Sequence, residues 1–297
     1  METISKAGAV SPFTLIAQDG VEVTAYRALP DGPSRGLVQI AHGIAEHFGR
    51  YRHLTDRLTA AGYTVYGVDH RGHGRSTGSA GLGHFGSPGF QAVVDDMASL
   101  SRLAKGEQPG QPLILLAHSM GSFAAQLYLL EHASELSGLV LSGTAALDLL
   151  LGALLAGGGP VTLEVLNKGF EPGRTPYDWI SSDPAQVDAY IADPLSGFDV
   201  PEETLQSIFG LTAMATLDPR VANLPQDLPI YVISGQFDPV VGPDQTYSTA
   251  LVDRYRAAGV RRVDHRIYPG GRHEMFNEIN RDTVETELID WLNAITA

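Results

Sequence analysis

Short apolar runs alternate with longer amphipathic segments along most of the chain. The apolar runs have the length and the β-branched content of strands, and the longer segments carry apolar residues every three to four positions, as helices do. The predicted strands are 13–17, 21–29, 37–41, 63–68, 112–117, 138–142, 230–234 and 263–268. The predicted helices are 50–61, 90–105, 120–132, 245–258 and 283–295. This alternation predicts an α/β fold with a mostly parallel sheet and helices on both of its faces.

The alternation stops after residue 143 and resumes near residue 228. The segment between them is largely helical in pattern and is interrupted by prolines and glycines. We therefore predict a core formed by residues 1–143 and 228–297, with residues 144–227 inserted over the sheet as a helical cap. Within the last helix, Asp282-Thr283-Val284-Glu285 resembles a capping box, which places the start of that helix at Thr283.

Composition narrows the class of protein. The 297 residues carry a formal net charge of −14, which argues against a nucleic-acid partner, because phosphate binding depends on Lys and Arg. The chain has no cysteine, which excludes disulfides, thiolate metal sites and a cysteine nucleophile. We find no pattern of a secretory signal, and no apolar run approaches the roughly 18 residues that span a bilayer. These features favour a cytoplasmic protein.

The stretch 113–125, LILLAHSMGSFAA, has the pattern of a strand that turns sharply into a helix at Ser119. A serine in such a turn, with small residues two positions before and after it, is typical of the nucleophile of a serine hydrolase. The usual pattern is G-x-S-x-G. Ala117 replaces the first glycine here, and one methyl group is the smallest addition that the turn could accommodate.

A nucleophilic serine needs a base and an acid that orients the base. Asp238 follows the predicted strand 230–234, and His273 follows the predicted strand 263–268. The resulting order Ser, Asp, His is that of α/β-hydrolases, so Ser119, Asp238 and His273 are the predicted catalytic residues. Glu274 is a competing acid by position, and Asp69 is expected to tie down its own loop.

Acyl transfer also requires hydrogen-bond donors for an oxyanion. In this arrangement one donor is the backbone N–H after the nucleophile, and the other comes from the loop after an earlier strand. The first is the N–H of Met120. The second is predicted to be the N–H of Ile44, because His42-Gly43-Ile44 directly follows the strand 37–41.

Several motifs together resemble one family. Residues 42–51, HGIAEHFGRY, resemble the HG-x-x-EH-x-x-RY motif of monoacylglycerol lipases and bacterial lysophospholipases, which are serine aminopeptidase S33-type hydrolases. Residues 69–76, DHRGHGRS, and 190–195, YIADPL, are similar to further motifs of the same group, and 270–274, GGRHE, matches its bacterial form. The resemblance extends from about residue 20 to the C-terminus. The chain departs from the family pattern at Ala117 and at Ile44, where a smaller residue is common.

The resemblance implies an eight-stranded α/β-hydrolase core with a helical cap, and hydrolysis of a fatty-acyl ester on a small polar head group, with no cofactor. It also implies that Glu46, Arg50 and Tyr190 lie near the polar end of the substrate. The leucine-rich stretch 147–155 is expected to line an acyl tunnel, and transient contact of the cap with a membrane or micelle is the less favoured role. The oligomeric state is not predicted.

Two other classes of function stay open at this point. A peptidase, a thioesterase or a C–C bond hydrolase uses the same catalytic residues. A binding protein that has lost catalysis is disfavoured, because Ser119, Asp238 and His273 are all present. His70 and His73 have a spacing that can bind zinc, but the family loop explains the same residues, so no metal site is expected.

Overall fold

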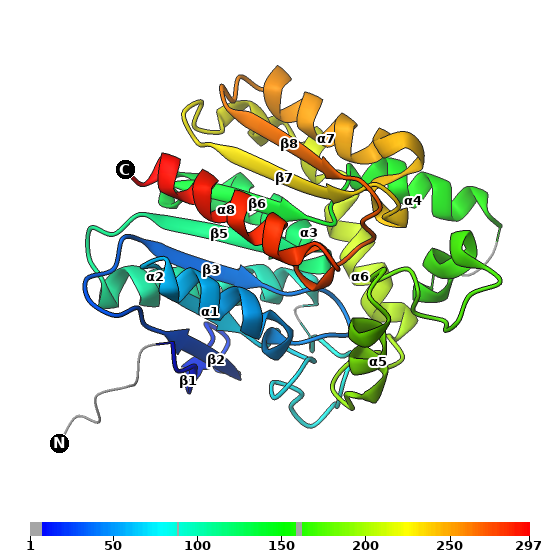
Figure 1. Cartoon of the computed structure of the whole chain (residues 1–297), viewed down its shortest axis with the longest axis horizontal. Helices are drawn as coiled ribbons and strands as arrows, with labels where there is room; N and C mark the ends of the chain where they lie inside the picture. Colours follow the sequence, from blue (N-terminus) through cyan, green and yellow to red (C-terminus); the bar gives the residue numbers. More distant parts are fainter. Residues whose placement is uncertain (1–7, 88, 159–161) are drawn as a thin grey trace.

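The computed structural model describes residues 8–87, 89–158 and 162–297 (Figure 1). Its strands form one open sheet in the order β1-β2-β4-β3-β5-β6-β7-β8. Strands β1 and β2 are antiparallel to their neighbours, and all other neighbours are parallel, which confirms the predicted fold class. The strands are β1 (Ser11–Ile16), β2 (Glu22–Ala28), β3 (Leu37–Ala41), β4 (Thr64–Val68), β5 (Leu113–His118), β6 (Gly138–Ser142), β7 (Ile230–Gly235) and β8 (Val263–Tyr268).

Helices cover both faces of the sheet because its central strands are apolar on both sides. The covering helices are α1 (Arg52–Ala60), α2 (Phe90–Glu107), α3 (Met120–His132), α7 (Thr246–Ala257) and α8 (Arg281–Ile295). In β5, Ile114 and Leu116 pack in the core beneath α1 and α8, whereas Leu113 and Leu115 pack in the core beneath α2, α3 and α7. Short 3₁₀ helices connect them, namely η1 (Phe48–Tyr51), η2 (Ala133–Glu135), η6 (Pro239–Val241), η7 (Pro243–Gln245) and η8 (Met275–Asn277).

The described part of the segment between β6 and β7 consists of helices joined by turns and irregular stretches, with no strand. Its helices α4 and α5 lie on the side of the molecule toward which the central strands point (Figure 1). The elements are α4 (Leu147–Ala156), η3 (Leu163–Phe170), α5 (Pro184–Ala192), α6 (Glu202–Thr212), η4 (Ala215–Leu217) and η5 (Pro219–Asn223). We call residues 144–227 the cap segment, and its status as a separate domain stays a prediction. No helix of the described residues is both long and apolar enough to traverse a bilayer.

Two predicted helix starts are wrong. Helix α8 begins at Arg281 with Asn280 as its N-cap, so Asp282 lies within the first turn and the predicted capping box does not form. The Glu285 side chain instead forms a hydrogen bond with His53 of α1. The predicted helix 50–61 is divided into η1 and α1, because the His47 side chain caps a separate short helix by accepting a hydrogen bond from the Gly49 N–H.

Candidate active site

Ser119 occupies the turn between β5 and α3 in a strained conformation. Its φ is +50° and its ψ is −121°, a region that non-glycine residues rarely adopt. The Ser119 N–H donates to the Ser142 carbonyl of the next strand at 2.9 Å, which holds the turn in place. A side chain at Gly121 would collide with the carbonyls of Ala41 and His42, so glycine is required there. Ala117 is buried in the core without such a conflict.

The structure brings His273 and Asp238 together from the ends of two neighbouring strands. His273 Nδ1 lies 2.9 Å from Asp238 Oδ1, which also accepts a hydrogen bond from the Val240 N–H at 2.9 Å. Both side chains are buried. Because a carboxylate can only accept, His273 carries its proton on Nδ1 when neutral. Its Nε2 is buried and has no partner among the described residues, so this atom is free to accept a proton.

The environment of His273 favours its protonated form. Burial opposes the charge, but the carboxylate of Asp238, and further away those of Glu274 and Glu46, outweigh burial and raise the pKa of His273. The ring packs against Trp179, with centroids 4.8 Å apart. Gly143, at φ +57°, lies behind the ring, and a β-carbon there would come within 2.7 Å of His273 Cε1.

Hydrogen bonds of the His42 side chain hold the loop after β3. His42 Nδ1 donates to the Gly43 carbonyl at 2.7 Å, and His42 Nε2 accepts from the His70 N–H at 2.9 Å. The Gly43 carbonyl and the Ile44 N–H share one peptide plane, so the His42 bond sets the direction of the Ile44 N–H. In the described part of the chain, neither Ile44 nor Met120 uses its backbone N–H in a hydrogen bond. Both N–H groups are therefore available to a ligand.

Ser119 opens into an apolar pocket that Ile44 and Met120 also line. The cap segment supplies much of the wall, since α4 and α6 contribute leucine, isoleucine and phenylalanine side chains. The apolar side chains that line the pocket include Phe123, Leu150, Leu154, Leu205, Ile208 and Phe209. The predicted lining role of the leucine-rich stretch is thus compatible with where Leu150 and Leu154 lie.

Glu46, Arg50 and Tyr190 meet in a buried network beside this pocket. Arg50 forms ion pairs with Glu274 and, at 3.4 Å, with Glu46, and its guanidinium lies 4.9 Å from the centre of the Tyr190 ring. Glu46 also accepts hydrogen bonds from the Gly43 N–H and from Tyr51 Oη, the latter at 2.7 Å. Burial, with the neighbouring Glu274, raises the pKa of Glu46 to about 7 against the opposing effect of Arg50.

A second cavity adjoins the apolar pocket. Tyr190, Tyr177 and Trp179 line it, and Thr162, Leu163, Trp179 and Leu205 border both spaces. Of the predicted substrate-binding residues, Tyr190 reaches this cavity, whereas Glu46 and Arg50 lie behind it in the buried network. Tyr177 and Trp179 were not predicted, because isolated aromatic residues in an irregular segment give no periodic signal. Gly143 could have been identified, since it directly follows strand β6.

Two further histidines, His70 and His73, stabilise the loop after β3. The rings of His70 and His73 surround His42, with centroids 4.3 Å and 5.3 Å away, and burial lowers the pKa of all three. Asp69 accepts hydrogen bonds from Tyr26 Oη and from the N–H groups of residues 48 and 75. Asp69 therefore ties down its own loop, as predicted.

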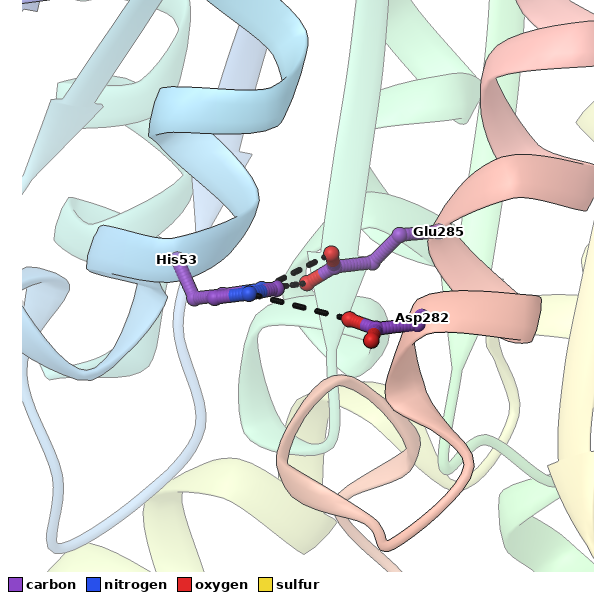
Figure 2. Close-up of side chains that lie close together, drawn as sticks. All are labelled: His53, Asp282 and Glu285. Carbon is purple, nitrogen blue, oxygen red and sulfur yellow. Dashed lines mark hydrogen bonds and ion pairs between the residues drawn. The ribbon is translucent and has the colours of Figure 1, made fainter.

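One group among the described residues could hold a metal ion, and it lies away from this site. His53 of α1 faces Asp282 and Glu285 of α8 (Figure 2). Its Nδ1 is 2.9 Å from Glu285 Oε2, and its Nε2 is 3.7 Å from Asp282 Oδ1. Arg57 Nη1 lies 3.6 Å and 3.8 Å from the two carboxylates. Because this guanidinium and His53 already pair with the two carboxylates, we interpret the group as an ion-pair cluster that joins the two helices.

The sheet order, the strained serine and the His273–Asp238 pair define an α/β-hydrolase. A family model described as serine aminopeptidase, S33, matches residues 32–280, and the chain belongs to this family. A monoacylglycerol lipase of Mycolicibacterium smegmatis is 35% identical over 92% of this chain and 93% of its own length. The human monoglyceride lipase is 26% identical over 95% of this chain and 90% of its own. Among solved structures, a thermostable carboxyl esterase from Bacillus coagulans in complex with glycerol has a TM-score of 0.85 at 31% identity, covering 97% of this chain and 99% of that one. These comparisons confirm the resemblance stated from the sequence motifs.

Proposed function

We propose that the protein is a serine hydrolase that cleaves esters of fatty acids with small polar alcohols, such as monoacylglycerols or lysophospholipids. Two observations carry the proposal: the buried His273–Asp238 pair, in which His273 Nε2 has no partner among the described residues, and the apolar pocket that Ser119 lines. The names of the relatives support an ester of this kind as the substrate.

In the proposed mechanism Ser119 Oγ attacks the ester carbonyl while His273 Nε2 accepts the hydroxyl proton. Asp238 stabilises the imidazolium that forms, and the N–H groups of Ile44 and Met120 bind the oxyanion. Each such donor contributes about 3 kcal/mol of transition-state stabilisation in measured cases. The imidazolium returns the proton to the leaving alcohol, which leaves an acyl-enzyme. Water, deprotonated by the same nitrogen, then releases the fatty acid.

The proposed substrate lies across the two adjoining cavities. Its acyl chain occupies the apolar pocket beneath α4 and α6, and its head group lies toward Tyr190, with Glu46 and Arg50 acting from behind. Residues 144–227 then act as a cap over the acyl chain. Leu155, which is 61% exposed on α4, supports transient contact of the cap with lipid aggregates that contain the substrate.

Replacement of Ser119 tests the proposal. Ser119→Ala is expected to lower kcat for monoacylglycerol hydrolysis by about 10⁴–10⁶-fold while circular dichroism and thermal unfolding stay unchanged. Ser99→Ala on α2 is the matched control. In the described structure the Ser99 hydroxyl bonds to Asp95 and Arg102 of the same helix, so this variant should keep full activity. A fully active Ser119→Ala protein would falsify the assignment.

A peptidase is the second candidate, and the description of the matching family favours it. The apolar lining of the pocket argues for an acyl chain instead. A chain-length series of monoacylglycerols and p-nitrophenyl esters, assayed beside aminoacyl amides, separates the two. Preference for the amides would reassign the protein as a peptidase. Thioesters belong in the same series, since the catalytic residues alone do not distinguish a thioesterase.

A further inference from the structure

The cap segment contacts the His273 loop through its backbone. The His273 N–H donates to the Trp179 carbonyl at 3.3 Å, and the Glu274 N–H donates to the Ile180 carbonyl at 2.7 Å. Arg272 Nη1 donates to the Ser181 carbonyl at 3.1 Å. These bonds join residues that are about ninety positions apart in the sequence. This part of the cap segment therefore holds the loop that carries His273, the proposed general base.

The same segment contacts the loop that carries Ile44. The Gly197 N–H, in the turn after α5, donates to the Ala45 carbonyl at 2.9 Å. Ala45 directly follows Ile44 and has a φ of +53°. A non-glycine residue at positive φ persists only where surrounding contacts hold it. The cap segment supplies one of those contacts, next to the proposed oxyanion donor.

A side-chain pair fixes the turn that makes this contact. His47 Nε2 lies 2.7 Å from Asp193 Oδ2, and Asp193 Oδ1 accepts from the Leu195 N–H at 2.9 Å. His47 Nδ1 accepts from the Gly49 N–H at 3.1 Å, so the ring proton belongs on Nε2 and is donated to Asp193. A neutral imidazole therefore makes both of its bonds, and position 193 must supply two acceptor oxygens, one for His47 and one for the Leu195 N–H.

We propose that His47 and Asp193 are positioning residues that hold the oxyanion loop in its active conformation. Their bond fixes the turn 193–197, whose Gly197 N–H holds Ala45, and this chain of contacts keeps the Ile44 N–H directed at the reaction centre. The proposal rests on the proposed function, because it assigns these residues to the oxyanion donor of that same site. In this proposal the turn after α5 holds the oxyanion donor in place, in addition to covering the substrate.

Substitutions at Asp193 separate positioning from other roles. Asp193→Ala is expected to lower kcat about tenfold with KM changed less than about twofold, because only transition-state binding is lost. Affinity for a long-chain alkyl trifluoromethyl ketone, whose adduct places an oxyanion in the same site, should fall by a similar factor. Asp193→Asn offers one acceptor oxygen for two donors, the His47 Nε2–H and the Leu195 N–H, so its kcat should lie between those of the wild type and Asp193→Ala. His47→Ala should match Asp193→Ala, and the double variant should be no worse than either one.

Asp188→Ala is the matched control on the same helix. Its carboxylate pairs with Arg174 at the surface and contacts no part of the oxyanion loop, so kcat and ketone affinity should be unchanged. The proposal is overturned if Asp193→Ala keeps wild-type kcat, if it raises KM alone, or if Asp188→Ala is equally impaired. Failure of the proposed function is seen separately, as retained activity in Ser119→Ala.

Discussion

Three carboxylates determine how readily the His273 imidazole accepts a proton. Burial alone would lower its pKa, yet the adjacent Asp238 and the more distant Glu274 and Glu46 raise it. In the proposed mechanism only the neutral ring can act as base. With His273 as the proposed base, the pH below which kcat/KM falls is therefore set by the balance between burial and these three charges.

Glu274→Gln is expected to shift the acid limb of kcat/KM to lower pH by about half a unit, because one carboxylate that raises the His273 pKa becomes neutral. The amide keeps an acceptor for Arg50 and Asn277. The measurement is the pH dependence of kcat/KM on a soluble ester. The exposed Glu22→Gln serves as control, and an unchanged or upward-shifted limb in Glu274→Gln would contradict the role given to this charge.

The raised pKa of His273 also has a consequence for stability. The folded state binds the proton more tightly than the unfolded chain does, so this contribution is fully present below the unfolded-state pKa. It is lost as the pH rises through the higher folded-state pKa. Near neutral pH, the folded protein is thus stabilised less by this residue than it is in mild acid.

At the residue scale, position after a strand was enough to predict that Asp238 and His273 lie together, because such positions converge at one edge of a parallel sheet. The catalytic roles of these two residues and of Ser119 stay predictions. The contact of Trp179 with His273 could not be predicted from the sequence, because it depends on how an irregular segment packs and not on any local pattern. The pairing of His47 with Asp193 was beyond reach for the same reason, although both lie in the recognised motifs.

Helix α4 presents neighbouring leucines to two different surroundings. Leu154 lines the apolar pocket, whereas Leu155 is 61% exposed. The helix is apolar nearly all round, so its sequence did not indicate which leucines face the pocket. Packing against α6 and α7 decides this, together with the ion pair between Asp148 and Arg254 at 2.6 Å.

Leu154→Trp is expected to shift the preferred ester toward shorter acyl chains, because the larger side chain fills part of the pocket. The ratio of kcat/KM for long-chain and short-chain p-nitrophenyl esters should fall about tenfold. Leu155→Trp, one position along, should leave that ratio unchanged for monomeric substrates. Equal effects of the two variants would exclude α4 as a wall of the acyl site.

Element boundaries were the weakest part of the sequence-based description. The central strands were placed within a residue or two, since their apolar runs are uninterrupted. The start of α8 was misplaced because Asp282-Thr283-Val284-Glu285 has the residue types of a capping box without its contacts. Glu285 is buried between α1 and α8, and this tertiary contact overrides the local preference.

Two large apolar cores, one on each face of a single sheet, hold the sheet and its helices together, and a smaller cluster of Trp179, Ile180, Val187 and Tyr190 packs within the cap segment. The central strands contribute to both, which explains why their sequences lack alternation. The fold class followed from this pattern. The arrangement of the cap segment did not follow, because its bonds to the loops that carry His273 and Ile44 connect distant positions largely through backbone groups, which any residue carries.

Leu116→Ala in β5 is expected to lower the free energy of unfolding by about 2–5 kcal/mol, since the side chain is fully buried in the core beneath α1 and α8. Urea denaturation followed by circular dichroism measures the change. Ile16→Ala, at a position 57% exposed on the edge strand β1, should change it by less than about 0.5 kcal/mol. Comparable losses in the two variants would refute a core centred on β5.

Gly143 has a consequence for engineering this enzyme. It is buried and does not line the apolar pocket, so a designer who randomises only pocket positions would leave it untouched. Yet a β-carbon at this position would lie within 2.9 Å of both His273 Cε1 and His118 Cε1. In a deep mutational scan, position 143 should therefore be nearly as intolerant as the three proposed catalytic residues, and libraries for new substrates should keep it fixed.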